Sequence, residues 1–435
     1  MRADALAACA AALLVTVVTA RARAEDEEAH LAQDAPRDPL VFVADPRMGV
    51  ETTVRSIDSL SRVVFRYEDA LGNLDLRLDE RRPMDKTVGV VGRSLQLVFV
   101  DEPLAEITSL ASHEVGGHGA RARELDIDVS YRFTLPLVYR ALFSPKDEER
   151  ATGMVEFLPG PPVEGDRAAV VTVGGLEANA VQAWWINARV VRSGGVARAS
   201  DLLVYGASKL PYFDALLSVP NDQEDGNDAA AYVTGLQDRS NQWSAEDRRR
   251  ISGRIGAAYL WNLFDPTLLY AAYGTLYEFL WRGERASRMP LPTIDGTTVF
   301  LSPRFALSPF GAEHALDLFL ARGERMLDVY ARVVSTGIWD AYGAGARVLG
   351  LRALDVLSIG AELDVWRAPE ILLGERAVYD RPSRLGVNGG AFGDLTIGRG
   401  VGLTGKLAAK TSGFVLGQPI AAGIHGYLGL RLDWR

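Results

Sequence analysis

The chain has 435 residues, 24% of them charged and 48% apolar, with a formal net charge of -9. This length suffices for two or three domains with a substantial core, and the composition excludes wholesale disorder. The negative charge, with no basic run longer than residues 248–250, excludes nucleic acid as an expected partner.

The N-terminus has the pattern of a secretory signal peptide over residues 1–24. Arg2 precedes an apolar stretch, and Ala22-Arg23-Ala24 supplies small residues before an acidic run. We therefore expect export to the periplasm or the outer membrane, with an uncleaved membrane anchor as the alternative. The one cysteine, Cys9, lies inside this segment. A mature chain from Glu25 would hold a metal through histidine and carboxylate alone.

Residues 25–50 are acidic and aperiodic, and predict a flexible leader. The following residues, 51–290, predict a mainly helical, metallopeptidase-like region. Within it, residues 94–100 are apolar on both alternating faces and predict a buried strand. Asp101, Glu102 and Pro103 then predict the start of a helix that continues through residues 113–118.

Further helices are expected beyond this point. Residues 176–191 predict a helix with Glu177 and Asn179 in its first turns, and residues 200–217 predict another. The acidic stretch 221–228 lacks the final glutamate of a calcium loop and is interpreted as a solvated turn. The apolar segments after residue 254, broken at Asp265-Pro266, are shorter than the roughly 20 residues that span a bilayer and are interpreted as core helices.

Residues 291–435 change to a twofold period. Leu316, Leu318 and Leu320 alternate with Asp317 and Phe319, and similar runs continue to the C-terminus. About seven or eight antiparallel strands are expected, either as a sheet packed on the helices or as an outer-membrane barrel, because both show this alternation. The predicted fold class is therefore α+β, with a helical zincin-like region followed by a C-terminal antiparallel β region.

The main chemical motif is His113-Glu114-Val115-Gly116-Gly117-His118, which holds two of the five histidines. Zinc hydrolases commonly use two helical histidines four residues apart, with a glutamate after the first. Here the spacing is five, which in a regular helix turns the imidazoles about 140° apart. A π-bulge would restore the shared face, and the two glycines tolerate a distorted backbone.

This motif resembles His-Glu-x-x-Gly-His, the expanded zinc motif of the dipeptidyl-peptidase III family of metallopeptidases. The resemblance implies that His113 and His118 bind Zn²⁺ and that Glu114 is the general base that activates a zinc-bound water. It also implies a third ligand from a glutamate on a later helix, for which Glu177 is the best match. It is confined to these two segments, and the β-rich half has no counterpart in that family.

The sequence thus predicts an exported zinc metallopeptidase that hydrolyses peptide bonds in a peptide or protein substrate, with outer-membrane association left open. Alternatives are a non-enzymatic envelope β-barrel protein with a helical periplasmic module, and a zinc hydrolase acting on another substrate. Tyr232 and Arg121 are candidates for stabilising the oxyanion. Other carboxylates available as the third ligand are Glu124, Asp126 and Asp128.

Overall fold

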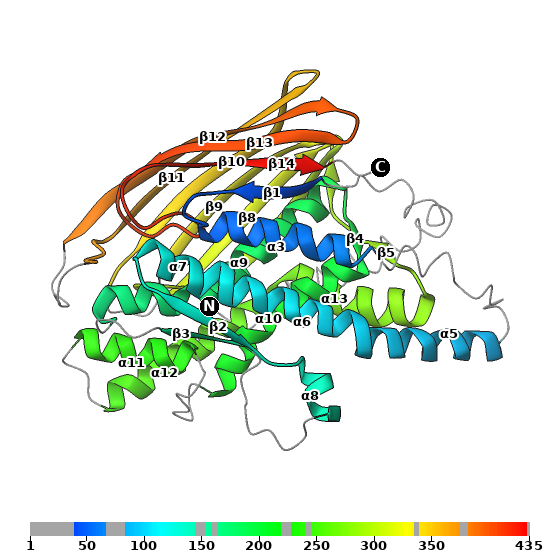
Figure 1. Ribbon diagram of the computed structural model, residues 1–435, viewed down its shortest axis with the longest axis horizontal. Coiled ribbons are helices and arrows are strands. Elements are labelled where there is room, and N and C mark those ends of the chain that lie inside the picture. Colours follow the sequence, from blue (N-terminus) through cyan, green and yellow to red (C-terminus); the bar gives the residue numbers. More distant parts are fainter. Residues whose placement is uncertain are drawn as a thin grey trace.

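The structure is a computed structural model that describes residues 39–66, 83–143, 153–157, 163–218, 228–240, 245–334, 339–373 and 382–432. The expected signal peptide and residues 25–38 of the expected leader lie outside these ranges. The described residues form a layer of helices against one face of a large antiparallel sheet (Figure 1). The α+β class is confirmed.

The sheet has ten strands in the order β1-β14-β13-β12-β11-β10-β9-β8-β7-β6. The eight long strands from β7 to β14 form seven antiparallel pairs, each between strands that are consecutive in the chain. The strands are β1 (Leu40–Ala44), β6 (Thr293–Ile294), β7 (Thr297–Ser308), β8 (Gly311–Arg322), β9 (Arg325–Val334), β10 (Tyr342–Leu354), β11 (Leu357–Pro369), β12 (Ser383–Gly398), β13 (Val401–Lys410) and β14 (Gly423–Leu432).

The first strand of the sheet comes from the expected leader. Leu40–Ala44 forms β1 and pairs with β14, from Leu40↔Leu432 to Ala44↔Leu428. Residues 40–44 of the leader are therefore ordered as an edge strand, in which all five side chains are apolar and the backbone pairs with β14. The N-terminal and C-terminal parts of the chain are thereby joined in one sheet.

The helical layer is built around the long helix α9 (Gly165–Arg192), most of whose side chains are buried. The other helical elements are α3 (Val50–Val64), α5 (Pro83–Gln96), η3 (Leu97–Asp101), α6 (Glu102–Ala111), η4 (Ser112–His118), α7 (Gly119–Glu124), α8 (Leu137–Phe143), α10 (Ala199–Ser218), α11 (Asp228–Ser240), α12 (Ala245–Tyr259), η6 (Leu260–Phe264), α13 (Pro266–Tyr273) and η7 (Gly274–Arg282). Two small sheets pair β2 (Val129–Phe133) with β3 (Gly153–Phe157), and β4 (Val196–Arg198) with β5 (Ala286–Arg288).

The predicted strand at residues 94–100 is wrong. Helical structure runs from Pro83 to Glu124 through α5, η3, α6, η4 and α7, so the helix does not begin at Asp101. Val98, Phe99 and Val100 are exposed on it. A short apolar run has no distinct period, and here the helix on either side decides its conformation.

The apolar segments near residues 260–282 are also less buried than expected. Leu260, Leu263, Leu269 and Leu276 are each more than 40% exposed. Among the residues that the structure describes, no helix combines the length and apolar character required to cross a membrane.

Candidate metal centre

The two motif histidines lie on a π-helical segment. Regular α-helix gives way to η4 at Ser112–His118 and resumes at Gly119. The wider turn absorbs the extra residue in the five-residue spacing, so both imidazoles lie on one side of the helix, with their Nε2 atoms 3.2 Å apart. The predicted π-helical distortion is confirmed.

The glycines of the motif serve close packing rather than an unusual backbone conformation. Gly117 meets the glycine pair of α9, where a Cβ on Gly117 would lie 2.6 Å from the Gly174 carbonyl carbon and from Gly175 Cα. A Cβ on Gly116 would lie 3.1 Å from a side-chain methyl of Val54 on α3. Because neither helix carries a side chain at this crossing, η4 and α9 approach backbone to backbone.

Asp228, the first residue of α11, completes a cluster with the two histidines. Its Oδ2 lies 2.7 Å from His113 Nε2 and 3.0 Å from His118 Nε2. Ligand atoms about 2.0–2.1 Å from a tetrahedral ion are separated by about 3.3 Å, which is close to this triangle of 2.7, 3.0 and 3.2 Å. Within the described part of the chain, this His-His-Asp group is suited to hold a metal ion.

The Nδ1 atoms of both rings are held by oxygen acceptors. His118 Nδ1 lies 2.7 Å from the Val171 carbonyl oxygen, which only accepts, so Nδ1 carries the hydrogen. His113 Nδ1 lies 2.7 Å from Asn179 Oδ1, and the amide nitrogen of Asn179 donates to Ser109. The Nε2 lone pairs therefore face each other and Asp228. Metal-binding histidines typically have this arrangement.

The electrostatics of the cluster favour a cation between the three side chains. Burial alone would lower the pKa of His118, but the nearby Asp228 and Glu114 carboxylates raise it to about 9. The pKa of His113 is also raised, against burial, by Asp228. In turn the histidines hold the pKa of Asp228 well below its usual range. An environment that stabilises a proton at Nε2 also stabilises a divalent ion there.

Gly175 lies directly against the two ligand nitrogens. A Cβ on Gly175 would be 2.5 Å from His118 Nε2 and 2.6 Å from His113 Cε1. The space beside the Nε2 pair therefore exists because residue 175 has no side chain. The cluster reaches the surface at Asp228, whose side chain is 28% exposed.

The structure does not bring Glu177 to the histidines. Its carboxylate is fully buried and accepts two hydrogen bonds from the Arg121 guanidinium, one of them 2.8 Å long from Nε. Burial raises the pKa of Glu177, and the charge of Arg121 opposes that shift. Of the other carboxylates considered, Glu124 binds the same guanidinium at 2.6 Å. Arg121 is thus the centre of a buried ion-pair cluster and does not join the metal cluster.

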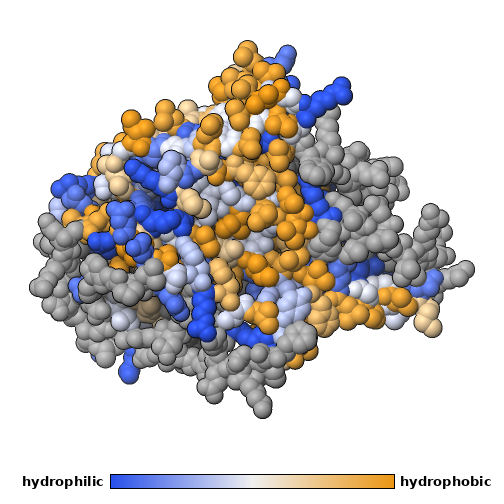
Figure 2. Space-filling view, in the orientation of Figure 1, coloured by the Kyte–Doolittle hydropathy of each residue, from blue (hydrophilic) through white to orange (hydrophobic). Residues whose placement is uncertain are grey.

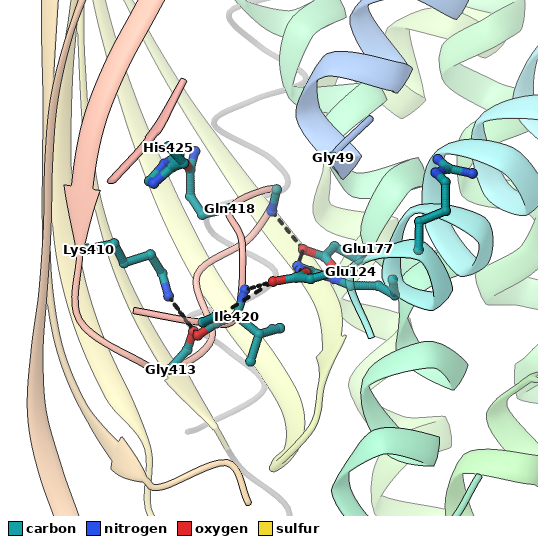
Figure 3. Close-up of polar contacts among 12 residues, drawn as sticks. Gly49, Glu124, Glu177, Lys410, Gly413, Gln418, Ile420 and His425 are labelled. Atoms are coloured by element: carbon teal, nitrogen blue, oxygen red, sulfur yellow. Dashed lines mark hydrogen bonds and ion pairs between the residues drawn. The ribbon is translucent and has the colours of Figure 1, made fainter. Parts of the chain in front are cut away.

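This ion-pair cluster also anchors the connection between β13 and β14. The backbone N–H of Gly417 donates to Glu177 over 2.7 Å, and the N–H of Ile420 donates to Glu124. Figure 3 shows this connection, folded inward from the sheet against the helices that carry the two glutamates. Glu177 therefore ties the helix next to the metal cluster to the sheet.

The two remaining predicted site residues have different positions. Glu114 is 5% exposed and close enough to both histidines to contribute to their raised pKa values. Tyr232 is buried beneath the sheet, where its hydroxyl donates to the Ser308 carbonyl at 2.7 Å. The structure thus keeps Glu114 beside the cluster and directs the Tyr232 hydroxyl toward β7.

Asp228, Asn179 and Gly175 were not predicted as site residues. Asp228 ends the acidic stretch that was interpreted as a solvated turn. A helix start rich in carboxylates was its only signal, because the contact spans 110 residues from His118. The paired glycines at 116–117 and 174–175 were a stronger signal, since two such pairs suit a close helix crossing.

Comparison with known proteins adds no relative. The chain matches no protein-family model, no curated protein and no solved structure.

Proposed function

We propose that this protein is a zinc-dependent metallopeptidase in which His113, His118 and Asp228 hold the ion. One observation carries the proposal: three ligand atoms converge within 3.2 Å of one another, with both imidazoles fixed through Nδ1. Two neutral imidazoles and one carboxylate suit zinc and leave a coordination position for a reactant. The spacing of the motif, which resembles the expanded peptidase motif, also supports this reading.

Zinc in such a site supplies Lewis acidity for hydrolysis. The chain's own contribution is to position and to transfer protons. Glu114 follows His113 on the π-helical segment and is shielded from solvent, as suits a carboxylate that accepts a proton from attacking water and returns it to the leaving amine. Asn179 and the Val171 carbonyl keep Nδ1 protonated, so both Nε2 lone pairs remain directed at the ion.

The proposed ligand set differs from the predicted one at one position. Asp228 replaces Glu177 because only Asp228 has an oxygen within hydrogen-bond distance of the two Nε2 atoms among the described carboxylates. Glu177 then has the role of neutralising Arg121. The proposal also keeps three expectations from the sequence. The metal is Zn²⁺, the substrate is a peptide or protein, and the protein is exported.

Hydrolysis of a mixed peptide library by zinc-loaded full-length protein tests the function. The wild type should cleave, and Glu114→Gln should retain zinc while losing about 100-fold or more of the rate, as expected for loss of a general base. Glu106→Gln is the matched control, because Glu106 lies on α6 and accepts from the Leu137 N–H at the surface. Equal rates in Glu114→Gln and wild type would remove Glu114 from the chemistry. A zinc-loaded wild type inactive on all peptides would favour the non-enzymatic alternative.

A further inference from the structure

The sheet presents an apolar face on the side away from the helices. On β9 to β14 the side chains that point outward alternate with those that point toward the helices, and many are more than 40% exposed, such as Leu385 at 75% and Leu407 at 66%. In Figure 2 apolar residues cover much of the upper part of the visible face, where Figure 1 places the strands. The outward positions are Leu327, Val329, Ala331, Val333, Tyr342, Ala344, Ala346, Val348, Leu351, Ile359, Ala361, Leu363, Val365, Leu385, Val387, Gly389, Ala391, Gly393, Leu395, Ile397, Val401, Leu403, Gly405, Leu407, Ala409, Ile424, Gly426, Leu428, Leu430 and Leu432. We call this set the outer face. The charged residues in the same outward rows of β9 to β14 are Arg325 and Arg367, one at each end of the set.

The opposite face of the sheet, which is turned toward the helices, carries buried charges. Lys406 forms a 2.8 Å ion pair with Glu362, and Arg304 of β7 binds Asp317 of β8 at 2.9 Å. Asn388 donates to Asp364 across 2.7 Å. A sheet with one face in water normally turns its apolar side chains toward the protein and its polar ones outward. Here the order is reversed, with polar side chains inside and apolar ones outside.

Charged residues lie at both ends of the outer face and not between them. The hairpins at one end carry Arg322, Glu324, Asp355 and Arg399, and the other end carries an exposed ion pair between Glu370 and Arg384. The strands between are 10 to 16 residues long. At about 3.4 Å per residue and a tilt of about 40°, even the shortest spans roughly 25 Å, the height of the apolar band of membrane-embedded strands.

The edges of the sheet are covered by the helical layer. At the β1 edge, the backbone N–H groups of Val41 and Val43 donate to Ser59 and Ser56 of α3, at 2.8 and 3.1 Å. At the β7 edge, η6 and α12 pack on the strand, where Tyr259 contacts the Phe305 ring at 4.7 Å. Covered edges allow a sheet to face an apolar medium, in which unpaired backbone groups cost several kcal/mol each.

We propose that the outer face contacts the hydrocarbon core of a lipid bilayer. The exposed apolar surface is on the order of 1,000 Å² or more, beyond the roughly 300–600 Å² of the largest patch on a typical soluble monomer. A protein partner or a second copy would be expected to meet about one hydrogen-bonding group per 100–200 Å². Between its two ends the outer face offers no side-chain hydrogen-bonding group, because Tyr342 and Arg367 are cross-strand partners at one end, so hydrocarbon is the matching medium. This inference does not depend on the metal or on peptidase activity.

Site-specific labelling of the full chain in vesicles tests the proposal. Single cysteines are introduced at Leu363, Leu407 and Leu430 in a Cys9→Ser background, and labelled with an environment-sensitive fluorophore. The vesicles contain phosphatidylethanolamine and phosphatidylglycerol at about 3:1. Glu246→Cys, exposed on α12, is the matched control. The three outer-face labels should shift to the blue on vesicle addition and be quenched by spin-labelled acyl chains, whereas the control label should respond only to aqueous iodide.

A second measurement uses charge. Leu407→Arg should lower the vesicle-bound fraction about 30-fold in flotation, and Glu324→Arg in the hairpin should not, because a cation in the middle of the band is costly. Outer-face labels that stay accessible to iodide in the presence of vesicles would overturn the proposal. Labels that become protected without lipid, in proportion to protein concentration, would assign the face to a second copy instead.

Discussion

Replacing Gly175 by alanine should weaken metal binding strongly without unfolding the protein. The new methyl carbon would lie 2.5 Å from His118 Nε2 and 2.6 Å from His113 Cε1, whereas ordinary contacts require about 3.5 Å. The imidazoles must therefore move by about 1 Å, twice the tolerance of about 0.5 Å of a preorganised site. We expect zinc affinity to fall by about 100-fold, or about 2.8 kcal/mol, in a competition titration against a chromophoric chelator.

Two matched glycine variants isolate the cause. Gly206→Ala, on α10, places its methyl where no atom lies within 4 Å, so affinity should be unchanged and stability unchanged or up to about 1 kcal/mol higher. Gly117→Ala meets the backbone of α9 instead of side-chain ends and should destabilise the fold by about 3 kcal/mol in urea unfolding. Wild-type zinc affinity in a folded Gly175→Ala protein would refute the position assigned to the ion.

Three further predictions address the surroundings of the site. Asn179→Ala removes the acceptor at His113 Nδ1 and should weaken zinc binding about 10-fold or more in the same titration. Glu177→Ala leaves the buried Arg121 guanidinium without its main partner and should lower the free energy of unfolding by about 3–5 kcal/mol, while any folded fraction retains zinc; loss of zinc alone would make Glu177 a ligand after all. Burial would raise the pKa of Glu51, but Lys406 and two arginines lower it from 4.5 to about 2. The stabilisation that this shift provides is therefore complete above pH 4.5 and is lost as the pH falls toward 2. In urea unfolding, Glu51→Gln should lower the free energy of unfolding by about 2–3 kcal/mol above pH 4.5, and by progressively less as the pH falls toward 2.

The strands of the C-terminal half were predictable because alternation is a local signal. Leu316, Leu318 and Leu320 lie on one face of β8 simply because successive side chains point to opposite sides. Which side faces the helices was not predictable in this way. The alternation is the same for a sheet with apolar side chains inside and for one with apolar side chains outside, and only the helices packed on Asp317 and its neighbours distinguish them.

The metal cluster was predictable only within one helix. The five-residue spacing and the two glycines fix a π-helical turn, so His113 and His118 could be paired from sequence. The third side chain depends on how α11 packs against α9, which no local pattern encodes. The helix begins at Gly165 instead of near Gly174, so Glu177 lies just over three turns into α9, where its carboxylate faces Arg121. The carboxylate that meets the histidines belongs to Asp228, at the start of α11.

Metal content of the purified full-length protein tests the central claim most directly. After dialysis against zinc and removal of loosely bound ions, the wild type and His425→Ala, a histidine bonded to Gln418 in the sheet, should each contain about one zinc per chain. His113→Ala and Asp228→Ala should contain almost none. A wild type without zinc, or a folded Asp228→Ala protein that retains a full equivalent, would contradict the assignment of His113, His118 and Asp228 as the metal ligands.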